Sequence, residues 1–124
     1  MQKDSPNAST TLQANSVTEI EPVAITAFEE RGFRWKSTVG DELTFERPLN
    51  KTDEVLYGTW GDEKSIERVV LRITPVKTGT FKAACFPYTI RNPNSGMEDI
   101  SRRLSVHSQT YSGALHDMRR SLNR

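Results

Sequence analysis

The sequence is poor in the residues that build metal centres and covalent cross-links. It has one cysteine and two histidines among 124 residues. A single cysteine excludes an intramolecular disulfide, and it excludes a zinc site that uses two thiolates. No long uninterrupted run of apolar side chains is present either, so we expect no transmembrane helix.

Excess charge of one sign is also lacking. The chain has 17 basic and 16 acidic residues, a formal net charge of +1, so no bulk field draws it to nucleic acid. The two halves differ, because residues 1–60 hold six basic and ten acidic side chains and residues 61–124 hold eleven and six. Two halves of one domain can neutralise each other. Nucleic-acid binding through the basic second half is therefore the lowest-ranked of our functional hypotheses.

Residues 1–17 are dominated by Ser, Thr, Asn and Gln. Such a stretch buries too little surface to offset the entropy lost on ordering. We therefore predict a disordered polar tail over residues 1–17 and a single α+β domain over residues 18–124. The tail has the composition of a spacer that follows a cleaved targeting segment. The chain is thus expected to be either cytoplasmic or exported with that segment removed.

One apolar stripe predicts a helix at about residues 19–31, because its members recur at helical spacing. The stripe consists of Ile20, Val23, Ala24, Ala27 and Phe28. Thr18 and Glu21 have the spacing of a capping box. Alternatively, Glu21 caps the helix and Pro22 is its first residue. Gly32 is a typical C-terminal stop.

The middle of the chain reads as β-structure, because apolar and polar residues alternate between turn signals. The alternation predicts a five-stranded antiparallel meander with strands at residues 33–37, 43–47, 55–60, 66–74 and 80–90. Short turns between consecutive strands favour antiparallel pairing. Pro87 cannot donate to a ladder, so the last of these strands should lie at an edge or carry a bulge at that point.

A second apolar stripe predicts a long C-terminal helix over residues 97–122. It consists of Ile100, Leu104, His107, Tyr111, Leu115, Met118 and Leu122. Glycine is unfavourable inside a helix, so Gly113 leaves open whether this helix is continuous or broken near residues 108–113. Its length would also allow contact with a second copy of the chain, as a homodimer.

Together these elements predict an α+β fold with both helices on one face of the sheet. The order of elements resembles helix-grip and cystatin-like folds in outline, and no family motif accompanies that likeness. The opposite face of the sheet should carry polar side chains. By residue parity these are Arg34, Lys36, Thr44, Glu46, Arg68, Arg72 and Lys82.

Residues that could carry catalysis are few. Cys85 lies in the middle of a predicted strand, where free cysteine is usually a small buried hydrophobe. His107 and His116 fall on opposite sides of a continuous helix and so cannot share a metal ion. Adjacent acidic pairs lie in polar turns, where they are normally solvated. We predict no catalytic residue, no metal and no cofactor.

The remaining candidates are exposed aromatic and basic side chains, which anchor interfaces and ligand pockets. The predicted binding residues are Trp35, Tyr57, Trp60, Arg68, Arg72, Tyr88, His107 and Tyr111. The favoured hypothesis is a non-catalytic interaction or structural module, such as a domain of a bacterial envelope-associated protein, with a protein partner. The alternative is a pocket for a small apolar ligand between the helices and a curved sheet.

Overall fold

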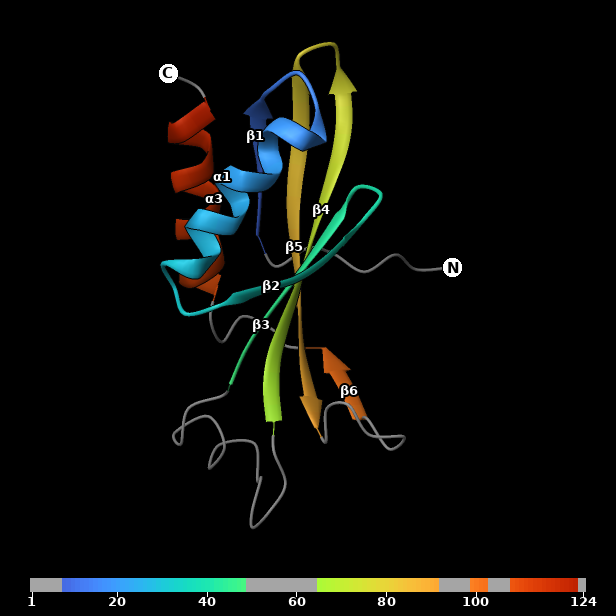
Figure 1. Cartoon of the computed structure of the whole chain (residues 1–124), viewed down its shortest axis with the longest axis vertical. Coiled ribbons are helices and arrows are strands. Elements are labelled where there is room, and N and C mark those ends of the chain that lie inside the picture. The colour runs from blue at the N-terminus through green and yellow to red at the C-terminus, as the bar shows by residue number, and fades with distance from the viewer. Residues whose placement is uncertain (1–7, 49–64, 92–98, 103–107, 123–124) are drawn as a thin grey trace.

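The computed structural model describes residues 8–48, 65–91, 99–102 and 108–122, and it has an α+β architecture (Figure 1). In chain order the elements are β1 (Ala8–Gln13), α1 (Val17–Glu29), β2 (Arg34–Val39), β3 (Glu42–Pro48), β4 (Ser65–Lys77), β5 (Thr80–Arg91), β6 (Asp99–Arg102) and α3 (Ser108–Leu122). The antiparallel sheet has the order β1-β5-β4-β3-β2, and β6 also pairs with β5. Both helices lie on one side of the sheet (Figure 1). The predicted fold class and helix placement are confirmed.

The strand order differs from a pure meander. From β2 to β5, each strand pairs in the sheet with the next strand in sequence. Strand β1, however, pairs with β5 at the far side of the sheet. Helix α1 therefore carries the chain from one edge strand, β1, to the other edge strand, β2. The strand that we predicted at residues 55–60 lies outside the described residues. The fifth strand of the sheet is instead β1, which the sequence analysis assigned to the tail.

The prediction of disorder over residues 1–17 is wrong for residues 8–17. Leu12 is fully buried and lies opposite Phe81 in the ladder with β5. The chain continues along the sheet, because the amide of Ala14 donates to the carbonyl of Gly79 at 3.1 Å. Average composition misses this strand, because a half-buried edge strand needs only a few apolar side chains on one face. Residues 1–7 lie outside the described residues.

Helix α1 begins two residues earlier than the stripe indicated. Its N-cap is Ser16, whose hydroxyl oxygen accepts a hydrogen bond from the amide of Glu19 at 3.3 Å. Neither Thr18 nor Glu21 is the cap, so both predicted caps are wrong. Pro22 lies inside the helix, where it lacks the amide hydrogen that would bond to the carbonyl of Thr18.

Gly32 ends the helical region, as predicted. It has φ of 89°, which only glycine adopts without strain. The amide of Phe33 then donates back to the carbonyl of Phe28 at 3.1 Å, and the two rings meet edge to face at 5.6 Å. This turn directs the chain from α1 into β2 and places Phe33 in the core.

The core lies between the helices and the inner face of the sheet, which is the face toward the helices. From the sheet it contains the buried residues Leu43, Phe45, Val69, Leu71, Ile73, Ala83 and Cys85. From the helices it contains Ile20, Ala24, Ala27, Phe28, Tyr111, Ala114, Leu115 and Met118. The prediction that Cys85 is a buried hydrophobe is confirmed. Neither of the helices that the structure describes is long and apolar enough to cross a membrane.

The prediction of a helix over residues 97–122 is wrong in its first part. Residues Asp99–Arg102 form β6, where Ile100 lies opposite Ile90 of β5, and α3 begins at Ser108. Pairing with β5 satisfies the backbone of this short segment, and such tertiary context overrides a weak local preference. Within α3 the helix runs through Gly113 without a break.

Pro87 occupies a gap between two strands that share one side of β5. Strand β1 reaches Cys85, and β6 ends at Arg102, opposite Tyr88. On its other side β5 pairs with β4, where Pro87 lies opposite Val69. The residue that lacks an amide hydrogen therefore lies where the described part of the sheet has no strand on that side. The prediction of an edge strand or a bulge at Pro87 is wrong, because β5 is an inner strand and its register with β4 runs through Pro87 without a shift. The gap between β1 and β6 is what accommodates a residue that cannot donate to a ladder.

Candidate binding site

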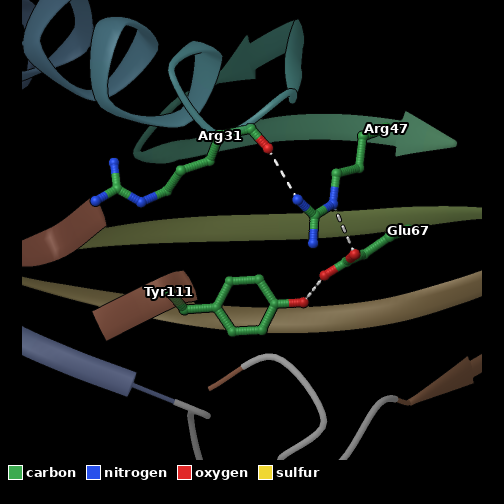
Figure 2. Close-up of polar contacts among 4 residues, drawn as sticks. All are labelled: Arg31, Arg47, Glu67 and Tyr111. Carbon is green, nitrogen blue, oxygen red and sulfur yellow. Dashed lines mark hydrogen bonds and ion pairs between the residues drawn. The ribbon is translucent and has the colours of Figure 1, made fainter. Parts of the chain in front are cut away.

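A chain of polar contacts links the side chains of Tyr111, Glu67 and Arg47 with the backbone carbonyl of Arg31 (Figure 2). We call it the polar cluster. The carboxylate of Glu67 is fully buried. One of its oxygens accepts a hydrogen bond from the Tyr111 hydroxyl, and the other accepts one from Nε of Arg47 at 2.9 Å. A buried charge requires such partners, because leaving it unpaired costs several kcal/mol.

Arg47 is held from three directions. Besides its ion pair with Glu67, its Nη1 donates to the carbonyl oxygen of Arg31 at 2.8 Å. Its guanidinium also lies 4.4 Å from the ring centroid of Phe33, which is a favourable cation–π contact. Arg47 thus joins β3 to β4 and to the turn that follows α1, and its side chain remains 20% exposed.

Arg31 connects the two helices. Its Nη1 donates to the carbonyl of Ala27, and its Nη2 pairs with the carboxylate of Asp117 on α3 at 2.9 Å. A Cβ atom at Gly113 would lie 2.9 Å from Nη2 of Arg31. Glycine at this position therefore leaves room for the guanidinium beside α3.

The polar cluster holds strands and helices in position, because its polar atoms already form hydrogen bonds and ion pairs with one another. Both oxygens of Glu67 have donors, and Tyr111 is 1% exposed. Cys85 is buried as well, and desolvation raises the pKa of its thiol far above the ordinary value. No group of acidic, histidine or cysteine side chains among the described residues could hold a metal ion.

An open pocket of about 520 Å³ lies where β2 begins and β3 ends. These two ends meet because the strands are antiparallel, with Arg34 opposite Glu46. We call it the basic pocket, and its lining includes Arg34, Lys36, Glu46, Arg47, Pro48 and Ile66. Arg47 belongs both to this pocket and to the polar cluster, so the cluster fixes one wall of the pocket.

Counting only the described residues, the basic pocket has an excess of positive charge. The carboxylate of Glu46 is paired with Nε of Arg68 at 2.6 Å, and Arg47 is paired with Glu67. Arg34 and Lys36 are exposed, and the structure gives them no ion pair with any described residue. The pocket is therefore suited to an anionic group.

The pocket opens at one end of the outer face, which is the face of the sheet away from the helices. The register places a row of side chains across this face: Arg34, Glu46, Arg68 and Tyr88. Further along, Arg72 pairs with Glu42 at 2.8 Å, and its guanidinium lies 4.8 Å from the ring centroid of Phe86. Two arginines of the outer face, Arg68 and Arg72, are thus held in place by glutamates.

The predicted binding residues do not form one site. Arg68, Arg72 and Tyr88 share the outer face. Trp35 is 42% exposed on the edge strand, but it lies opposite Phe45, and its indole nitrogen donates to the Thr38 hydroxyl at 2.9 Å. Tyr111 is enclosed in the core, where it is 1% exposed, and so lies apart from the outer face. The other three, Tyr57, Trp60 and His107, lie outside the described residues.

The two charged residues at the centre of the polar cluster, Arg47 and Glu67, were not among the predicted site residues. A signal was available, because Glu67 precedes Val69 by two residues and so shares the core-facing side of the strand. A buried carboxylate on that side requires a nearby cation or hydrogen-bond donor.

Comparison with known protein families finds no matching family model, and comparison with curated proteins finds no match.

Proposed function

We propose that this domain is a non-catalytic interaction module that contacts a protein partner through the outer face of its sheet. The observation that carries the proposal is the row of Arg34, Glu46, Arg68 and Tyr88 across adjacent strands. Arginine and tyrosine are enriched among the residues that dominate protein interfaces. The register places the row on four adjacent strands, β2, β3, β4 and β5. Each member neighbours a core-facing residue in its strand, so the row lies on the opposite face.

The ion pairs of the outer face favour binding, because they order the arginines in advance. Arg68 is held by Glu46 and Arg72 is held by Glu42. Immobilising a long side chain on association costs about 0.5–1.5 kcal/mol, and a side chain that is already held avoids part of this cost. The face therefore has the character of a preformed protein-binding surface.

The packing under α1 favours this function over the small-ligand alternative. Aromatic rings fill the space between α1 and the sheet in the described residues. Phe28 stacks on Phe45 with centroids 4.6 Å apart, and Phe33 lies 6.4 Å from Tyr111. A small apolar ligand there would have to displace these rings. A rise in melting temperature with a panel of fatty acids would favour the alternative.

The proposal is tested by photo-crosslinking in cells that express the full chain. A photoreactive residue replaces Thr44, which lies on the outer face opposite Val70, or Arg119, which is exposed on α3. We expect a specific crosslinked product at position 44 that disappears when Arg68→Glu is added. The same products at both positions, or none at position 44, would refute the proposal.

A further inference from the structure

We infer that the basic pocket binds the carboxylate of an acidic peptide segment. The inference rests on the proposed function, because the segment would belong to the partner of the outer face. Its basis is the pair of exposed cations, Arg34 and Lys36, beside an open volume of about 520 Å³. Ligand-binding pockets in proteins typically have volumes of about 300–1,000 Å³.

The surroundings of Arg34 favour an incoming carboxylate. Its cross-strand neighbour is Glu46, whose negative charge is already offset by Arg68 at 2.6 Å. A second carboxylate can therefore approach Arg34 with little repulsion. A guanidinium binds a carboxylate through two parallel hydrogen bonds, which adds both strength and directional preference.

The other walls of the pocket fit a peptide better than a small free anion. Pro48 of β3 and Ile66 of β4 contribute apolar surface to the pocket lining. The aliphatic stem of a glutamate, or the apolar side chain next to it, can pack there. Arg47 supplies a wall that does not have to be ordered on binding, because Glu67 and the Arg31 carbonyl already hold it.

The charge pattern beyond the pocket disfavours nucleic acid as the occupant. Nucleic-acid binding depends on many phosphate contacts with free lysines and arginines. The next arginines along the outer face, Arg68 and Arg72, are paired with Glu46 and Glu42. Arg34 and Lys36, which have no ion pair within the described part of the chain, therefore match a short acidic segment. A longer polyanion would meet neutralised arginines.

The test is an NMR titration of the full chain with a hexaglutamate peptide at low ionic strength. Parallel titrations use inorganic phosphate and hexathymidylate. We expect saturable amide shifts at Arg34, Lys36 and Gly32. The double variant Arg34→Gln/Lys36→Gln should bind the peptide about 10-fold more weakly, since it removes two charge-assisted contacts. The control Arg119→Gln/Arg120→Gln removes the same charge from the exposed side of α3 and should leave affinity unchanged.

Four results would overturn the inference. Equal weakening in both double variants would mean general charge attraction, and the absence of a saturable shift would mean no site. Phosphate binding as tight as peptide binding would mean a free-anion site, and tighter hexathymidylate binding would mean a nucleic-acid surface. If the peptide does not bind but the crosslink at position 44 still forms, only the inference about the basic pocket is refuted. Peptide binding without that crosslink refutes the outer face as the partner surface.

Discussion

The hydroxyl of Tyr111 on α3 donates a hydrogen bond to the buried carboxylate of Glu67 on β4, across 44 positions of sequence. The same carboxylate receives Nε of Arg47 from β3. One acidic side chain therefore ties the C-terminal helix to two central strands. An apolar core holds a helix against a sheet without fixing its position closely, whereas this directional contact defines where α3 lies.

Removing the hydroxyl in Tyr111→Phe should lower the free energy of unfolding by about 1–3 kcal/mol, because a buried carboxylate oxygen loses its donor. Urea denaturation measures the change. Tyr88→Phe is the matched control, since Tyr88 is only half-buried on the outer face, and it should stay within about 0.5 kcal/mol of the parent. Equal stability of Tyr111→Phe and the parent would contradict the role given to this contact.

The ion pair between Arg47 and Glu67 should show strong coupling. Arg47→Met leaves Glu67 charged and buried without its cation, which costs about 3–5 kcal/mol. The double variant Arg47→Met/Glu67→Leu removes both charges and should recover a large part of that loss. A double-mutant cycle measured by denaturation checks this, and additive losses would show that the pair is not coupled.

Gly113→Ala tests the packing of Arg31 against α3. Alanine is favoured over glycine inside a helix by about 1 kcal/mol, but the new Cβ would lie 2.9 Å from Nη2 of Arg31. The guanidinium would have to shift from its pairing with Asp117. We expect the substitution to stabilise the Arg31→Ala protein more than the parent. The same gain in both backgrounds, measured by thermal unfolding, would exclude this contact.

Leu12→Ala tests whether β1 belongs to the folded unit. Leu12 is fully buried, so its truncation should cost about 2–5 kcal/mol. Thr11→Ala, at an exposed neighbouring position of β1, is the control and should cost less than about 1 kcal/mol. If both variants unfold at the same urea concentration as the parent, residues 8–13 do not contribute to stability.

Cys85 should be inert in the folded protein. Burial raises the pKa of its thiol, so the reactive thiolate does not form while the chain is folded. Ellman's reagent should therefore label native protein only at the rate of unfolding, and should label it fully in guanidinium. Because the unfolded thiol ionises more easily, stability should fall as pH rises above 9.0 in the parent more than in Cys85→Ala. Fast labelling of native protein would contradict the burial.

The elements that were predicted correctly are those whose pattern is local. The alternation along β3 and β4 correctly predicted which side of each strand faces the core, and the helical stripe did so for α1. Gly32 predicted where the helical region ends. The elements that were missed depend on distant partners. Strand β1 and strand β6 are short, and each is defined by pairing with β5.

The candidate site was predictable only in part, for the same reason. Parity placed Arg68 and Arg72 on the outer face, where the register has them. Parity could not show that both are neutralised by glutamates on β3, because that requires the pairing register between two strands. Tyr111 was recognised as part of an apolar stripe, and its bond to Glu67 depends on the docking of α3.

The division of one side of β5 between β1 and β6 has a consequence for biosynthesis. Strand β1 leaves the ribosome before β5, and its ladder partners, from Thr80 to Cys85, are translated much later. Until then Leu12 has no place to be buried, and this border of the sheet remains open. Closing it demands a contact between distant parts of the chain, which slows folding. The ribosome must therefore synthesise β5 before β1 of the nascent chain can pair with it.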